Sequence, residues 1–231
     1  MSRRIAIVED EPDIRANYVD LFRRQGYLVD AYADRLQASA TLLDKLPDLV
    51  ILDIGLGDEI DGGYELCREL RARSPQLPII FLTARDSEID TVVGLRIGGD
   101  DYVTKSVSLD QLNARVSALL RRAALANTAN DREKPIIDGP LVLSMERMLV
   151  TWHAQNIELT VTELWIFQAL AQNPGHVKSR SQLMQAADIY VDLATISSHI
   201  KRIRRKFLAI DPGFDGIEAV YGAGYRWVRQ G

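Results

Sequence analysis

Short apolar runs alternate with longer amphipathic stretches through the first half of the chain. The runs are rich in β-branched and other apolar residues, and they cover residues 4–8, 28–32, 48–53, 78–82 and 101–104. Residues between them repeat their apolar positions with a helical period. This alternation predicts an α/β unit with a parallel sheet, whose crossover helices cover both faces and whose ligands bind at the carboxyl ends of the strands.

The pattern changes from about residue 136. Strand-like runs at 140–144, 148–152 and 157–160 precede helical segments, and a strand pair is expected near residues 219–227. Thr160 and Glu163 have the spacing of a capping box, which predicts a helix from there to about Gln172. The second half is therefore expected to be a smaller α+β unit.

The two patterns are separated by a stretch without apolar period. Residues 123–135 are rich in Ala, Asn and charge and close with a proline, which is typical of a linker. We therefore expect domains at 1–122 and 136–231.

Length and charge support this division. The 231 residues carry a net charge of -4, of which residues 1–122 hold -5 and residues 123–231 hold +1. No apolar run is long enough to cross a bilayer or to form a signal-peptide core, so we expect a cytoplasmic protein without membrane contact. The single cysteine, Cys67, cannot form an internal disulfide, which agrees with a reducing compartment.

Acidic residues stand at the predicted strand ends. Glu9 and Asp10 follow the first strand, and Asp53 ends the third. A parallel sheet would bring these carboxylates to one rim, where their mutual repulsion is relieved by a divalent cation. An all-oxygen ligand set suits Mg²⁺ or Mn²⁺.

The same rim is expected to receive Thr83 after the fourth strand and Lys105 after the fifth. If Asp53 attacked a phosphoryl group, the metal, Lys105 and Thr83 could stabilise its oxygens, and the product would be an acyl phosphate. In haloacid-dehalogenase-type phosphatases an acidic general acid follows the nucleophilic Asp by two positions, and that position here is Gly55. Slow turnover favours a stored signal over an enzymatic cycle.

These residues and their spacing resemble the receiver domain of two-component response regulators, which implies a flavodoxin-like (βα)5 fold for residues 1–122. The resemblance implies that Asp53 is the phosphoacceptor and that Thr83 and Tyr102 form the conformational switch. It also implies that Lys105 senses the phosphate. The implied metal ligands are Glu9, Asp10, Asp53 and the backbone carbonyl of Gly55.

Two features depart from the family pattern. Ser106 follows Lys105 where receivers usually have a proline in a cis peptide. A cis Lys105–Ser106 bond costs roughly 2.5 to 4 kcal/mol, which leaves either a strained cis bond or a trans bond with Lys105 directed differently. The loop after Asp53 lacks the usual proline and carries Asp58, Glu59 and Asp61. It resembles a proteobacterial subgroup of regulators linked to a dedicated sortase system.

A basic helix is expected at about residues 195–208. Ile196, Ile200, Ile203 and Phe207 form one apolar stripe, and no acid occurs between Asp192 and Asp211. A helix face of one sign suggests phosphate binding.

This segment resembles the recognition helix of the OmpR/PhoB-type winged-helix effector, which residues 136–229 follow up to a GxGY wing hairpin. The resemblance implies that Arg202 contacts base edges in the major groove of double-stranded DNA. The remaining implied DNA contacts are Thr195, Ser198, Lys201, Arg204 and Arg205. The family often has an arginine just before the GxGY motif, where this chain has Tyr221.

The same resemblance implies a homodimer on activation. Its charge pairs would involve Asp100, Asp101, Arg115 and Arg122, whereas a usual Lys–Glu pair maps to the neutral Thr91 and Gln111.

The sequence therefore predicts a response regulator, not an enzyme, with a sensor histidine kinase, DNA and RNA polymerase as partners. Phosphorylation of Asp53 would promote dimerisation and DNA binding. The alternatives are a phosphorylation-independent DNA-binding protein with a degenerate receiver, and a hydrolase of phosphoesters or acyl phosphates. A flavin- or dinucleotide-binding protein is disfavoured because Glu9 and Asp10 would repel a phosphate there.

Overall fold

The computed structural model describes residues 2–84, 94, 97–128, 134–187 and 193–229. The chain divides into two compact units, Met1–Leu120 and Arg121–Gly231. Each unit is described by itself.

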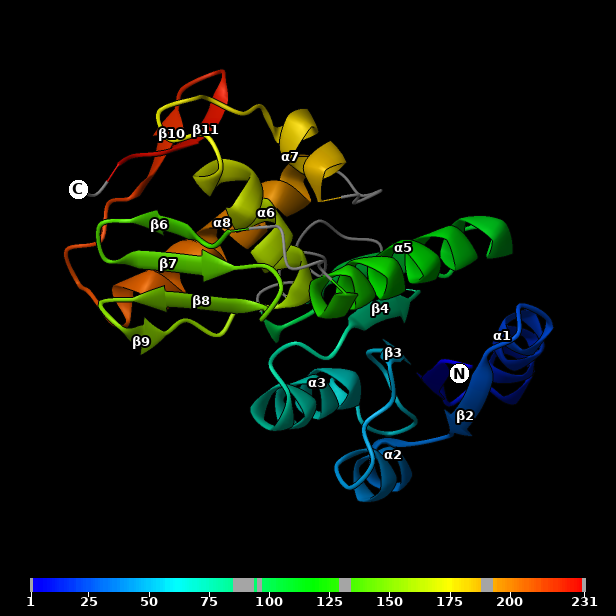
Figure 1. The fold of residues 1–231 in the computed structure, drawn as a ribbon. Coiled ribbons are helices and arrows are strands. Elements are labelled where there is room, and N and C mark those ends of the chain that lie inside the picture. Colours follow the sequence, from blue (N-terminus) through cyan, green and yellow to red (C-terminus); the bar gives the residue numbers. More distant parts are fainter. Residues whose placement is uncertain (1, 85–93, 95–96, 129–133, 188–192, 230–231) are drawn as a thin grey trace. The chain divides into compact units, whose positions relative to one another are not determined.

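The first unit contains a parallel five-stranded sheet with the strand order β2-β1-β3-β4-β5 (Figure 1). All five predicted strands are present, as β1 (Arg4–Val8), β2 (Leu28–Tyr32), β3 (Leu49–Leu52), β4 (Ile79–Thr83) and β5 (Asp101–Thr104). The three central strands pair β1 with β3 and β3 with β4 in register, for example Val8 with Leu52 and Leu52 with Phe81. This confirms the predicted receiver fold.

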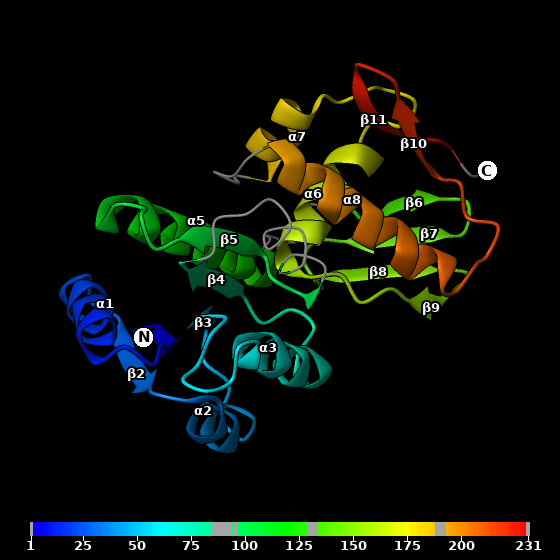
Figure 2. The ribbon, with the colours of Figure 1, turned by 180° about the vertical axis from the view of Figure 1, so that it is seen from behind.

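Helices cover both faces of this sheet (Figures 1 and 2). One face carries α1 (Pro12–Arg24) and α5 (Leu109–Thr128), and the other carries α2 (Arg35–Leu42) and α3 (Gly62–Arg73). Proline begins α1, where its missing N–H is not needed. The Asp34 side chain accepts a hydrogen bond from the Gln37 N–H at 2.8 Å and so caps α2.

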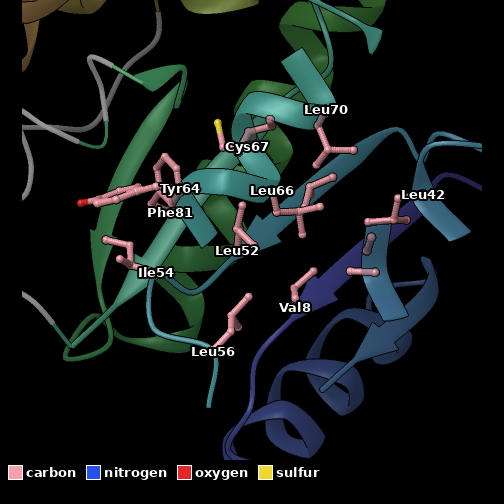
Figure 3. Packing of buried hydrophobic residues seen from close by; sticks show 14 of the residues in the cluster. Val8, Leu42, Leu52, Ile54, Leu56, Tyr64, Leu66, Cys67, Leu70 and Phe81 are labelled. Atoms are coloured by element: carbon pink, nitrogen blue, oxygen red, sulfur yellow. The ribbon is translucent and has the colours of Figure 1, made fainter. Parts of the chain in front are cut away.

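The core beneath α2 and α3 is formed by alternate residues of the central strands (Figure 3). Val8, Leu52 and Phe81 lie against Leu42, Leu66, Cys67 and Leu70 from the two helices. Cys67 is fully buried in this core as a free thiol, where it packs as a small apolar side chain. Burial on both faces explains why β3 and β4 are apolar at nearly every position.

From Ile136 on, the described residues of the second unit form a four-stranded antiparallel sheet, three helices and a terminal hairpin. The sheet contains β6 (Ile136–Asp138), β7 (Leu141–Ser144), β8 (Leu149–Trp152) and β9 (Gln155–Asn156), and the hairpin pairs β10 (Ile217–Val220) with β11 (Gly224–Trp227). The helices are α6 (Val161–Ala171), α7 (Arg180–Ala186) and α8 (Leu193–Leu208). This is the predicted winged-helix arrangement.

Two details of the strand prediction were wrong. The run at 157–160 is not a strand. The last strand of the sheet is β9, which ends just before this run. The short strand β6 was not predicted. By contrast, the capping box at Thr160 and Glu163 is present and begins α6.

Aromatic side chains form the core of the second unit. Each aromatic ring of this core contacts others of the set, and Phe207 stacks on Phe214 with ring centroids 4.4 Å apart. The set consists of Trp152, Phe167, Phe207, Phe214 and Trp227. This core fixes the rotation of α8, because Phe207 belongs to its apolar stripe.

Helix α5 continues to Thr128, so residues 123–128 of the predicted linker are helical. Residues 129–133 lie outside the described part of the chain. Among the described helices, none is both long and apolar enough to cross a membrane.

Candidate functional site

The rim at the carboxyl ends of β1 and β3 gathers three acidic side chains. The Asp53 N–H donates to the Val8 carbonyl at 2.9 Å, which sets the end of β3 beside the end of β1. Glu9, Asp10 and Asp53 each offer a carboxylate oxygen within 4.8 Å of the others. The structure thus brings together the three carboxylates predicted to meet there.

Lys105 reaches this cluster from the end of β5. Its Nζ lies 2.7 Å from Asp53 Oδ2 and 2.8 Å from Glu9 Oε1. The described part of the chain contains no cis peptide bond, so the Lys105–Ser106 bond is trans. The sequence left open whether a trans bond would direct Lys105 elsewhere. The structure shows that it does not, because the ammonium still contacts Asp53.

The environment changes the acidity of two of these groups. Burial raises the pKa of Glu9 from 4.5 to about 6, although the hydrogen bond from Lys105 opposes this change. Burial also acts against the charged form of Lys105, but hydrogen bonds to Asp53 and Glu9 dominate and raise its pKa above the usual value. Lys105 is therefore a fixed positive charge at the rim.

The donor set suits a hard divalent cation. All three groups are carboxylates, and hard oxygen ligands are what Mg²⁺, Mn²⁺ and Ca²⁺ prefer. Asp10 is partly exposed, whereas Glu9 and Asp53 are buried, so the cluster has one solvent-facing side. Gly55, whose carbonyl was a predicted ligand, follows in the partly exposed segment after Asp53.

Gly63 allows helix α3 to begin directly against the end of β3. A Cβ on Gly63 would lie 1.9 Å from the Asp53 carbonyl oxygen, which only glycine avoids. The Gly63 N–H donates to the Ile54 carbonyl at 2.9 Å and completes this close approach. Glycine at position 63 is therefore a requirement of packing beside Asp53.

The predicted switch residues lie in the neighbouring strands β4 and β5. Thr83 ends β4 and is 2% exposed, and Tyr102 in β5 is 7% exposed with its ring centroid 6.4 Å from that of Phe81. A Cβ on Gly94 would lie 2.9 Å from the Tyr102 ring. The buried position of Tyr102 therefore depends on glycine at position 94.

Helix α8 presents one exposed face. Lys201 and Arg205 are exposed, and Ser197 and Arg204 are partly exposed at helical spacing beside them. Thr195 and Ser198, which were also predicted to contact DNA, are only 2% and 6% exposed. The exposed face of α8 therefore contains fewer of the predicted DNA contacts than the sequence indicated.

Arg202 lies on the inner side of α8. Its Nε is 2.9 Å from Glu163 Oε1, and its side chain is 4% exposed. Lys206 Nζ lies 2.6 Å from the other oxygen of the same fully buried carboxylate. This placement does not agree with the predicted base contact, because the Arg202 guanidinium is held inside the unit by an ion pair with α6.

Glu163 is strongly held in its charged form. Burial alone would raise its pKa, but Arg202 and Lys206 outweigh burial and lower the pKa from 4.5 to about 2. The sequence pattern predicts only a capping role for Glu163. Its partners are 39 and 43 residues away along the chain, and no local pattern identifies them.

The hairpin β10–β11 is tied to the exposed face of α8. The Tyr225 hydroxyl lies 3.1 Å from Ser197 Oγ, and the Arg204 guanidinium lies over the Tyr225 ring at 5.9 Å. Arg204 also donates to the Ile217 carbonyl. At the hairpin tip Gly222 adopts a φ of 72°, and the Tyr221 side chain is fully exposed.

The four predicted dimer residues make contacts within the chain. Asp100 is fully buried with its Oδ2 2.7 Å from Arg71, and Asp101 lies 3.0 Å from Arg115. Arg122 donates to Thr162 Oγ1 at 3.1 Å within the second unit. Gln111 is exposed on α5, and Thr91 lies outside the described residues. Arg71, the ion-pair partner of the buried Asp100, was not identified from the sequence.

Comparisons with known proteins agree with both units. Residues 5–117 match the model of the response regulator receiver domain, and residues 154–227 match that of the transcriptional regulatory protein C-terminal domain. The chain is therefore a two-component response regulator with a DNA-binding domain.

Full-length relatives narrow this class. The chain is 38% identical to the transcriptional regulatory protein CreB of Escherichia coli strain K12 over 95% of each chain. It is 39% identical to the phosphate regulon regulator PhoB of Rhizobium meliloti, over 97% of this chain and 98% of that protein. It belongs to the OmpR/PhoB family of response regulators.

Solved structures support the same fold. The Thermotoga maritima regulator DrrB, an OmpR/PhoB homologue, is 27% identical with a TM-score of 0.53, and the match covers 99% of this chain and 100% of that one. A mutant of RitR, at 21% identity and the same coverage, has a TM-score of 0.77 and shows the fold alone.

Proposed function

We propose that Asp53 accepts a phosphoryl group from a sensor histidine kinase. The observation that carries this proposal is the contact between Lys105 Nζ and Asp53 Oδ2 at 2.7 Å, beside the carboxylates of Glu9 and Asp10. An oxygen of Asp53 attacks the phosphorus, the bond from phosphorus to the donor nitrogen breaks, and an acyl phosphate forms. Lys105 then pairs with a phosphoryl oxygen, where its raised pKa keeps it charged.

The carboxylate cluster supports a requirement for Mg²⁺, which Mn²⁺ could replace. Glu9, Asp10 and Asp53 would hold the cation together with the Gly55 carbonyl. When bound there, the cation offsets negative charge on the phosphoryl oxygens. The three acids alone would otherwise repel the incoming group.

Thr83 and Tyr102 are the proposed route from the rim to the rest of the receiver. Thr83 ends the strand between those of Asp53 and Lys105, and Tyr102 is buried beside Phe81. A hydroxyl of Thr83 that turns toward the phosphoryl group would alter the space around Tyr102. This change would favour a receiver homodimer, in which Asp101 and Arg115 exchange partners between two chains.

We propose that α8 enters the major groove of DNA with its exposed face. Lys201 and Arg205 are exposed on this face and are therefore the proposed contacts to phosphates and base edges. Arg202 positions the helix through Glu163 in this scheme. Dimerisation would place two such helices on paired half-sites, where the bound regulator would contact RNA polymerase.

The first experiment is intact mass spectrometry after incubation with Mg²⁺ and acetyl phosphate. The parent chain should gain one phosphoryl group, and Asp53→Ala should gain none. Asp58→Ala is the matched control, because Asp58 is an exposed acid in the same loop, and it should be modified like the parent.

The outcomes distinguish the candidate functions. No addition to the parent would support a phosphorylation-independent DNA-binding protein. Continuous release of phosphate over many turnovers would instead support a hydrolase. If one phosphoryl group is added, duplex selection from a random DNA library with phosphorylated and unphosphorylated protein should recover a sequence preference mainly for the phosphorylated form.

A further inference from the structure

The loop between β3 and α3 makes a direct contact with the carboxylate cluster. The Gly57 N–H donates to Asp10 Oδ2 at 3.1 Å. Gly57 has a φ of 63°, in the left-handed region that favours glycine. This hydrogen bond occupies one oxygen of Asp10 and fixes the orientation of its carboxylate.

The loop itself is closed by a short backbone ladder. The Leu56 N–H donates to the Glu59 carbonyl at 3.0 Å, and the Glu59 N–H donates to the Leu56 carbonyl at 3.2 Å. Gly57 lies inside this closed segment. Its position therefore follows the position of Glu59.

Glu59 is anchored to helix α2 across the loop. Its Oε2 lies 2.6 Å from Arg35 Nε, and the same guanidinium reaches Glu69 Oε1 on α3 at 2.9 Å. Ser39 donates to the second oxygen of Glu69 at 2.6 Å. A Cβ on Gly62 would lie 2.9 Å from Glu59 Cβ, so glycine there makes room for the Glu59 side chain.

We propose that Arg35 and Glu59 form a latch that holds the Gly57 amide on Asp10 and thereby sets the affinity of the carboxylate cluster for its divalent cation. This inference rests on the proposed metal site. Arg35 and Glu59 are positioning residues that touch the cluster only through the loop. Groups that orient metal ligands typically change metal affinity by about 10- to 100-fold when they are removed.

Arg35→Gln provides the decisive test because two explanations predict opposite signs. Loss of a nearby positive charge would by itself tighten binding of a cation. Loss of the latch would weaken it, and we expect the Mg²⁺ dissociation constant of the unphosphorylated full chain to rise about tenfold by isothermal titration. Arg35→Lys, which keeps the charge and can still pair with Glu59, should recover part of the affinity.

A matched control removes the same charge elsewhere. Arg68 pairs with Glu65 at the exposed surface of α3, where the two side chains are 54% and 55% exposed. Arg68→Gln should leave Mg²⁺ affinity within about twofold of the parent, because such a pair contributes little. Glu69→Gln keeps the Arg35–Glu59 contact and should also have a small effect.

Amide exchange provides a readout without metal. The Gly57 amide should exchange faster in Arg35→Gln than in the parent or in Arg68→Gln, as measured by NMR on metal-free protein. Unchanged exchange, or an unchanged or tighter Mg²⁺ dissociation constant in Arg35→Gln, would overturn the latch. Absence of Mg²⁺ binding by the parent would overturn the proposed metal site as well.

Discussion

The carboxylate rim of the first unit and the basic helix of the second are both clusters of like charge in the sequence, but the two regions use their charges differently. At the rim, Glu9, Asp53 and Lys105 all face one another. On α8, Lys201 and Arg205 face outward while Arg202 is bound to Glu163 inside the unit. Like charges at strand ends share a site, whereas like charges on a helix can be divided between surface and core.

The reason is geometric. The carboxyl ends of parallel strands must meet at one edge of the sheet, so the chain positions of their last residues suffice to place them together. Each residue of a helix points in a different direction, and its environment depends on how the helix is rotated. For α8 that rotation is fixed by Phe207 and its aromatic neighbours.

The largest expected effect follows from removing the acid that holds the inner side of α8. Glu163→Gln would leave Arg202 and Lys206 without their buried counter-charge, and we expect it to destabilise the second unit by about 3 to 5 kcal/mol. Calorimetric unfolding of the full chain measures this loss. Glu218→Gln breaks an exposed pair with Arg226 and should cost no more than about 1 kcal/mol. Equal losses of stability in Glu163→Gln and Glu218→Gln would mean that burial does not determine how much each acid contributes.

The same acid predicts a pH dependence of stability. Its pKa is lowered by folding from 4.5 to about 2, so its contribution is fully present above about pH 4.5 and is lost as the pH falls toward 2. Glu163→Gln should therefore flatten the loss of stability of the second unit in this acidic range.

The rim should respond to pH in a different window. Burial raises the pKa of Glu9 to about 6, and a protonated carboxyl cannot bind a cation. Mg²⁺ affinity should therefore fall below pH 6, by up to roughly tenfold per pH unit for one competing proton. Titration calorimetry from about pH 5 to 7.5 measures this trend. Glu9→Gln should bind more weakly at neutral pH and should lack the dependence. A parent affinity that is constant over this range would contradict the assignment of Glu9 as a ligand.

Folding raises the pKa of Glu9, whereas it lowers the pKa of Glu163. Because its folded pKa is above 4.5, its contribution to stability is greatest below pH 4.5 and is lost as the pH rises through about 6. The contributions of the two acids to stability therefore change with pH in opposite directions.

A smaller effect separates the outer and inner cations of α8. Lys201→Met should leave stability unchanged, weaken DNA binding and reduce the slope of log affinity against log salt by about one, as expected for one lost phosphate contact. Arg202→Met should instead destabilise the unit. Arg147→Met, in the exposed turn between β7 and β8, controls for net charge in fluorescence-anisotropy titrations at several salt concentrations. A slope that changes only with Arg202→Met would reverse the proposed assignment.

The sequence predicts the features that depend on local pattern, but not those that depend on packing between distant segments. The five strands of the receiver and the residues at their ends could be predicted, because apolar runs and strand-end positions are local properties. The Arg35–Glu59 and Arg202–Glu163 pairs could not, because they join segments 24 and 39 residues apart whose contact is decided by packing. The edge strand β9 was misplaced because the apolar Ile157 and Leu159 are buried without belonging to the sheet.

The smallest effect concerns the tip of the wing. Tyr221 is fully exposed at the turn of the β10–β11 hairpin, which Tyr225 ties to the exposed face of α8. A cation there would reach the DNA backbone if α8 lies in the adjacent major groove. Tyr221→Arg should therefore increase the salt slope by about one and tighten binding at low salt. Tyr221→Ala, which adds no charge, should leave the slope unchanged. If the arginine variant has the parent's slope, the wing does not approach phosphates, and the cationic contacts of this unit are confined to α8.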